Sequence, residues 1–228
     1  MHKVQAVSVP RSGHHLLVNC LKDYFGDKLG YCGNVFRTDP FSNSEITFQK
    51  NHDFSLDLPV EPGLKYLVQY RHPLESLISW YRWVVRNGIQ AEMNYGWRPL
   101  INKKAPFWSL YTRRNTQTRW HAFLEKRIPW WTKFISKWII DIDHPSVCHV
   151  DYAGFIRDPF NTLSQVLIFF EPVEDLDKKR LLEIIAKHDI RPKSNIKEFE
   201  YYDERIFRNI EKELIDYLDT AGIRPLYS

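Results

Sequence analysis

Apolar stretches of two kinds alternate along this chain, short continuous runs and stripes at helical spacing. Residues 2–9 are rich in Val and Ala and end at Pro10, which predicts a buried strand. Apolar residues then recur at helical spacing over residues 16–24, and Gly26 marks a helix end. The chain is therefore expected to open with a strand, a tight loop and a helix.

The same alternation continues to the end of the chain. Further strands are predicted over residues 46–49, 65–70 and 146–150. Helices are predicted from Pro73 onward, over residues 107–124, 130–140, 161–170 and 175–187, and between a capping Asp203 and Gly222. Strands that alternate with helices indicate an α/β fold with three layers, α/β/α, around a mostly parallel central sheet. Sheets of this kind bind ligands at the carboxyl ends of their strands.

Length and composition fit a single globular domain covering residues 1–228. With 43% apolar and 26% charged residues, the chain is not disordered as a whole. Its 8 Trp and its aromatic content of 15% indicate a well-filled core or a stacking pocket, and they leave room for an oligomer interface.

The net charge, the N-terminus and the cysteines indicate which partners and which location to expect. The net charge of +4 does not by itself indicate a nucleic-acid partner, but it suits a compact anionic ligand. The N-terminus lacks the apolar region of a signal peptide, and no run reaches the ~18 apolar residues of a membrane span, so no membrane association is expected. Cys20, Cys32 and Cys148 lack zinc-site spacing, so we expect no metal and a reduced, cytoplasmic location.

The first candidate ligand-binding segment is Pro10-Arg11-Ser12-Gly13-His14-His15, between the first predicted strand and the first predicted helix. Gly13 lets the backbone approach a ligand closely, and the amides at the start of the following helix favour an anion. Arg11 adds a fixed positive charge with forked donors. The alternative interpretation is an ordinary strand-to-helix turn.

Two further segments follow predicted strands. Arg71 ends the strand over residues 65–70, and Ser79 lies eight residues later on a polar stripe of the next helix, so the two could hold one phosphate. Lys50-Asn51-His52-Asp53 follows the weak second strand, and His52 beside Lys50 could be a general base. The alternatives are a solvated helix face and an ordinary loop histidine.

Together these segments resemble the sulfotransferases that use 3′-phosphoadenosine 5′-phosphosulfate (PAPS). In that family the phosphosulfate loop has Pro, Lys or Arg, Ser or Thr, then Gly-Thr-Thr, which residues 10–15 resemble. Arg71, Pro73 and Ser79 match the spacing of the 3′-phosphate motif, and Lys50-Asn51-His52 is similar to Lys-Thr-His. Residues 151–159 are similar to the Tyr-Glu-Asp-Leu…Asp-Pro segment. The resemblance spans residues 4–170 and implies a P-loop-NTPase-like sulfotransferase fold of the soluble bacterial or cytosolic type.

The resemblance also implies an activity. The sulfuryl group of PAPS would pass in line to a hydroxyl or amine of a small-molecule or carbohydrate acceptor, leaving 3′,5′-bisphosphoadenosine (PAP), without a metal. It implies His52 as general base, with Arg11 and Lys50 stabilising the developing charge. It further implies a nucleotide site made of Arg11, Ser12, Gly13, His14, His15, Arg71, Ser79 and Tyr152, with Arg191 and Lys193 in place of a late Arg-Lys-Gly element.

The sequence departs from the family pattern at the loop. His14 and His15 stand where the family has a pair of threonines, and Leu16 replaces an aromatic residue that stacks on adenine in cytosolic members. Residues 90–120 lie where the family places acceptor-side or lid structure, and their rings and arginines could bind a sugar, a phenol or an anionic acceptor. The alternative is a basic surface loop.

Other functions stay open at this point. The His14-His15 pair keeps open a nucleotide-binding protein of the same fold without turnover. A P-loop-type phosphotransferase would need ATP and magnesium, and the GxxxxGK(S/T) pattern is absent. Neither Cys20 nor Cys148 is followed by Arg six positions later, which counts against a cysteine phosphatase.

Overall fold

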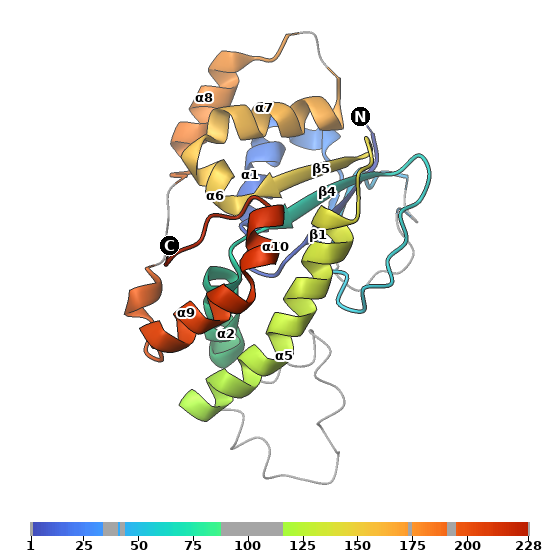
Figure 1. Ribbon diagram of the computed structural model, residues 1–228. Coiled ribbons are helices and arrows are strands. Elements are labelled where there is room, and N and C mark those ends of the chain that lie inside the picture. The colour runs from blue at the N-terminus through green and yellow to red at the C-terminus, as the bar shows by residue number, and fades with distance from the viewer. Residues whose placement is uncertain are drawn as a thin grey trace. The chain divides into compact units, whose positions relative to one another are not determined.

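The computed structural model describes residues 2–33, 41, 44–87, 116–172, 175–190 and 195–227. They fall into two compact units. The first unit comprises Met1–Arg71 and Phe134–Lys193, and the second comprises His72–Lys133 and Ser194–Ser228. The first unit holds the β-sheet (Figure 1).

Among the described residues, five strands form one parallel sheet in the order β2-β3-β1-β4-β5. The strands are β1 Val4–Ser8, β2 Tyr31–Cys32, β3 Phe48–Asn51, β4 Lys65–Tyr70 and β5 Val147–Asp151. Val4 pairs with Phe48 on one side and Lys65 on the other, so β1, β3 and β4 run in register. Their carboxyl ends therefore meet at one edge, where parallel sheets bind ligands.

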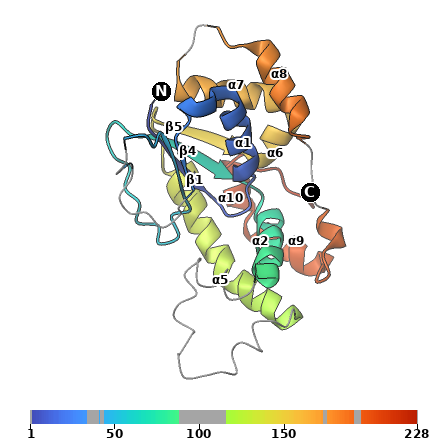
Figure 2. The same cartoon turned by 180° about the vertical axis from the view of Figure 1, so that it is seen from behind.

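The described helices of the first unit include α1 His14–Phe25, η1 Gly26–Lys28, η3 Ser136–Ile140, α6 Tyr152–Arg157, α7 Pro159–Phe170 and α8 Lys178–Lys187. α1, α7 and α8 lie together on one face of the sheet (Figures 1 and 2). Their apolar stripes bury Leu17, Leu21, Leu163, Val166 and Leu181 against the strands. The predicted α/β class with a parallel sheet is confirmed, and so are the strand over residues 65–70 and the capping role of Asp203.

One long helix, α5 Gln117–Ile135, continues directly into the π-helix η3 Ser136–Ile140. The prediction of separate helices over residues 107–124 and 130–140 is therefore wrong in the described part, and residues 107–115 lie outside it. Pro129 lacks a backbone donor and usually interrupts a helix. Here the buried rings of Phe123 and Trp131 flank it, so packing outweighs the local preference.

The second unit is helical and aromatic. It contains α2 Pro73–Asn87, most of α5, η4 Ile196–Glu198, α9 Glu204–Glu213 and α10 Ile215–Thr220. Its core brings together Trp80, Tyr81, Trp120, Phe123, Phe199 and Phe207. The Trp120 and Phe199 ring centroids lie 4.8 Å apart. Many of the chain's aromatic residues therefore fill the core of the second unit. The helix predicted up to Gly222 is divided at Leu214.

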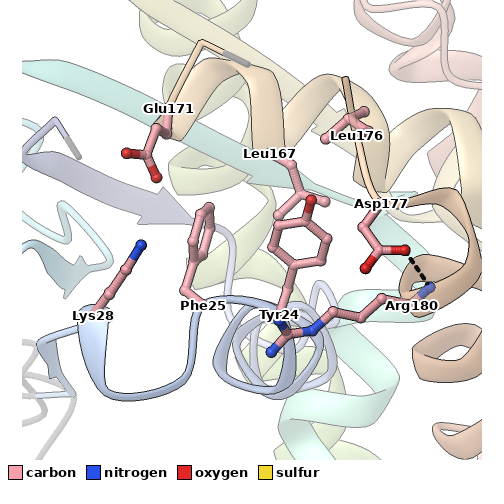
Figure 3. A pocket seen from close by; sticks show the side chains of 8 residues that line it. All are labelled: Tyr24, Phe25, Lys28, Leu167, Glu171, Leu176, Asp177 and Arg180. Atoms are coloured by element: carbon pink, nitrogen blue, oxygen red, sulfur yellow. Dashed lines mark hydrogen bonds between the residues drawn. The ribbon is translucent and has the colours of Figure 1, made fainter. Parts of the chain in front are cut away.

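A small cavity of about 200 Å³ opens between α1, α7 and α8 (Figure 3). It is lined by Tyr24, Phe25, Lys28, Leu167, Glu171, Leu176, Asp177 and Arg180. Tyr24 and Phe25 end α1, roughly 15 Å along the helix axis from its first residue. None of the residues predicted for the functional site lines this cavity. Within the described ranges, no helix is both long and apolar enough to cross a membrane.

Candidate anion-binding site at the carboxyl edge of the sheet

The loop between β1 and α1 leaves the first amides of α1 without a side-chain cap. Gly13 is the N-cap of α1, no side chain caps this helix, and its first turn holds no acidic residue. Arg11 has φ 68° and Gly13 has φ 85°, so the loop turns through two left-handed residues. The first amides of a helix carry partial positive charge and bind anions when no side chain takes them.

Tyr152 joins this loop to the end of β4. A Cβ added at Gly13 would lie 2.4 Å from Cδ2 of Tyr152, so only glycine fits beneath the ring. The Arg71 guanidinium lies 4.3 Å from the centroid of the same ring. Arg71 also donates from Nη1 to the carbonyl of Arg11 at 3.5 Å. The structure thus brings together Arg11, Gly13, Arg71 and Tyr152. Their role in binding a nucleotide stays a prediction.

His52 follows β3 and is held against β1. Its Nδ1 lies 2.6 Å from the carbonyl oxygen of Ser8 and 3.2 Å from the Ser8 hydroxyl. A carbonyl can only accept, so Nδ1 carries the proton and Nε2 carries the lone pair of the neutral ring. Lys50 lies two residues earlier on β3, paired in register with Ala6 of β1. Both side chains are buried.

The basic groups Arg11, His15, Lys50 and His52 lie close enough to affect one another's charge, and they are called here the cation cluster. Burial, followed by repulsion from Arg11, lowers the pKa of Lys50 to about 8. Burial, followed by repulsion from Lys50, lowers the pKa of His52 to about 3. The pKa of His15 is lowered by burial and then by Lys50 and Arg11. Because these basic groups oppose one another's protonation, a bound anion would favour their charged forms.

His14 and Ser12 are buried under the loop. The His14 ring lies 3.0 Å from Oε1 of Gln69 through Nδ1 and 3.3 Å from the Tyr31 hydroxyl through Nε2. Both ring nitrogens therefore have protein partners, which leaves the backbone amide of His14 for a ligand. In the described part of the chain, the buried Ser12 hydroxyl has no hydrogen-bond partner. An orphaned buried hydroxyl beside helix-start amides fits an anion ligand.

Some predicted site residues belong to the second unit or lie outside the described residues. Ser79 lies in α2, which belongs to the second unit, so its pairing with Arg71 stays a prediction. Arg191 and Lys193, and residues 90–115 of the expected lid, lie outside the described residues. Among the described residues, no group of three or more His, Cys, Asp or Glu side chains is placed to hold a metal ion.

The buried histidines predict acid sensitivity. His52 has an ordinary pKa of 6.5 when unfolded and about 3 in the folded chain. Between these values the unfolded chain binds the proton and the folded chain does not, so the free energy of unfolding falls as pH falls. Urea unfolding at pH 7 and pH 5 should show a loss of about 2 kcal/mol from His52 alone. The His52→Gln variant should lose less, and an equal loss in both proteins would contradict the assignment.

Many solved structures share this architecture, although neither a family model nor a curated protein sequence matches the chain. The mouse sulfotransferase SULT7A1, complexed with PAP, has a TM-score of 0.65 at 14% identity, covering 97% of this chain and 86% of its own. A retinol dehydratase in complex with retinol and PAP has a TM-score of 0.51 at 14% identity, covering 98% and 83%. A sulfotransferase from Alicyclobacillus acidocaldarius has a TM-score of 0.51 at 13% identity, covering 99% and 97%.

These matches run over nearly the whole chain and over most of each neighbour. Two of the three neighbours are named as sulfotransferases, and two are complexes with PAP. At 13–14% identity the likeness concerns the architecture of the chain. The chain therefore has the fold of the PAPS-dependent sulfotransferases.

Proposed function

We propose that this protein is a sulfotransferase that takes the sulfuryl group from PAPS and passes it to a hydroxyl or amine acceptor. The observation that carries the proposal is the cation cluster beside an uncapped helix N-terminus, at the carboxyl edge of the sheet. Two neighbours of the same fold are complexes with PAP, which supports an adenosine bisphosphate as the anion. PAPS supplies an activated sulfuryl group whose transfer releases PAP.

The proposed nucleotide site divides into two anion-binding parts. The amides that begin α1, the Ser12 hydroxyl and the Arg11 guanidinium bind the phosphosulfate. Arg71 binds the 3′-phosphate together with Ser79. His14 contributes its backbone amide, since its ring is bonded to Gln69 and Tyr31. In this proposal the loop binds the anion through the backbone amide of His14, so it does not need the hydroxyl of the threonine found in the sulfotransferase family.

His52 is the proposed general base. Its Nε2 holds the lone pair that accepts the acceptor's proton, because Nδ1 donates to Ser8. Burial first and Lys50 second lower the pKa of His52 to about 3. A bound anion opposes the repulsion from Lys50, so it raises this pKa and makes His52 a stronger base. Lys50 and Arg11 stabilise the negative charge that develops on the transferred and leaving oxygens.

The test is product formation. The purified protein is incubated with PAPS and a panel of phenols, alcohols, amines and sugars, and PAP and sulfated products are measured by mass spectrometry. We expect PAP to form only with an acceptor present. PAP binding without any transfer would favour the nucleotide-binding alternative, and magnesium-dependent phosphoryl transfer from ATP would favour the phosphotransferase.

A further inference from the structure

The residue after His52 is a buried carboxylate with an unusual backbone. Asp53 is 3% exposed and has φ 46°, a left-handed conformation that costs free energy in any residue but glycine. Leu56, three residues later, has φ 59°. The segment from His52 to Leu58 is therefore a strained turn, and interactions elsewhere must hold it in place.

Those interactions come from the π-helix η3. Lys137 Nζ donates to Asp53 Oδ2 at 2.6 Å, and Trp138 Nε1 donates to the same oxygen at 2.8 Å. The other oxygen, Oδ1, accepts from the Leu58 amide at 3.0 Å. Lys137 Nζ also donates to the carbonyls of Leu56 and Leu58, at 3.0 and 2.8 Å. One carboxylate and one ammonium thus close the whole turn.

The two side chains that bond to this carboxylate oxygen are consecutive residues of the π-helix. The amide of Asp141 donates to the Ser136 carbonyl, five residues earlier, at 2.8 Å. This wider turn is uncommon and often occurs at functional sites. It is anchored in turn to the sheet, because His149 Nε2 of β5 lies 2.8 Å from the Trp138 carbonyl. Trp138 also packs on Tyr66 of β4, with ring centroids 5.5 Å apart.

We propose that Asp53 is a positioning residue, which with Lys137 and Trp138 holds the His52 ring against Ser8 with Nε2 ready to accept a proton. The inference rests on the proposed function of His52 as the base. Charge-assisted bonds to a buried carboxylate are the strong kind, so they can offset the strain of the turn. Without them the turn relaxes, the bond from His52 to Ser8 is lost, and the ring leaves its productive orientation.

The hydrogen bonds described above for the Asp53 carboxylate do not involve the loop that is proposed to bind the sulfuryl donor. The loop of residues 10–15 leaves β1 and enters α1, whereas Asp53 is bonded within its own turn and to η3. Loss of Asp53 should therefore change the proton-accepting step and leave nucleotide binding nearly intact. A merely structural residue would instead lower stability without a selective effect on His52.

Nitrogen NMR of histidine-labelled protein tests the proposal directly. Among the described residues, the charged and titratable groups that act on His52 include Lys50 on β3 and His14 and His15 on α1, and the variants below alter none of these three. In the native protein we expect a neutral His52 ring protonated at Nδ1, with no titration down to pH 5. In Asp53→Ala and Lys137→Met, the two tautomers should mix and the titration midpoint should rise by more than one pH unit.

The matched control is Asp57→Asn, which changes an exposed carboxylate in the same turn and should leave the His52 signals unchanged. Asp53→Asn keeps the side-chain volume but not the charge, and it should give an intermediate spectrum if Asp53→Ala does not fold. Turnover of PAPS should fall about 10- to 100-fold in the Asp53 and Lys137 variants, with the KM for PAPS unchanged.

Folded Asp53 and Lys137 variants with an unchanged His52 spectrum would overturn the proposal. Failure of the proposed function looks different. In that case the native protein neither binds PAP nor turns over PAPS, while the NMR comparison still reports whether Asp53 controls the orientation of His52.

Discussion

Replacing His52 by alanine is expected to lower sulfuryl transfer by about 10²- to 10⁴-fold, the usual contribution of a positioned general base. The reason is the lone pair on Nε2, which the bond from Nδ1 to Ser8 fixes on the side away from β1. PAP affinity should change little, because in the proposed site His52 contacts the acceptor and not the nucleotide. Steady-state rates with PAPS and calorimetric titration with PAP measure the two effects separately.

His144→Ala is the control for this change. His144 is an exposed histidine in the turn before β5, and its loss should leave turnover unchanged. If His52→Ala keeps near-normal turnover on an acceptor that the native protein sulfates, His52 is not the base. The cation cluster would then serve nucleotide binding alone.

The second large effect is expected from Arg71→Ala. Arg71 is buried, and its guanidinium lies against Tyr152 and the carbonyl of Arg11, at the end of β4. A charge-assisted pair with the 3′-phosphate contributes about 1.5–3 kcal/mol, so PAP affinity should fall roughly 10- to 150-fold. ADP has no 3′-phosphate, so its affinity should change far less. The variant would therefore lose the distinction between the two nucleotides.

Calorimetric titrations of the native and variant proteins with PAP and ADP measure these changes in affinity. Arg157→Ala removes an exposed arginine from α6 and should bind both nucleotides like the native protein. An Arg71→Ala variant that keeps full PAP affinity would remove Arg71 from the site. An equal loss for PAP and ADP would mean that Arg71 supports the loop through Tyr152 instead of binding the 3′-phosphate.

Local patterns were sufficient for the elements that position the site. β4 occupies the predicted residues 65–70 because Tyr66, Leu67 and Val68 suit a strand buried on both faces. The loop over residues 10–15 was recognisable because a glycine and an arginine stand between a buried strand and an amphipathic helix. These signals depend on neighbours in sequence, so they appear in one sequence alone.

The rest depends on contacts between distant parts of the chain. The two-residue strand β2 has no period to detect. α5 passes through Pro129, against the local preference. Asp53 is bonded to residues 84 and 85 positions away, and its left-handed backbone is held by those bonds. Sequence reasoning also missed the contact between His14 and Gln69. The local signal for it was a polar residue, Gln69, inside a buried strand.

The most direct test of the central claim is a calorimetric titration of the native protein with PAP near pH 8, in buffers of different ionisation heat. Binding of the bisphosphate should raise the pKa of Lys50 above about 8, so the complex should take up protons from the buffer. We predict micromolar binding of PAP with proton uptake, and binding of ADP at least 10-fold weaker. No binding of PAP, or equal binding of both nucleotides without proton uptake, would contradict a sulfotransferase site at this edge of the sheet.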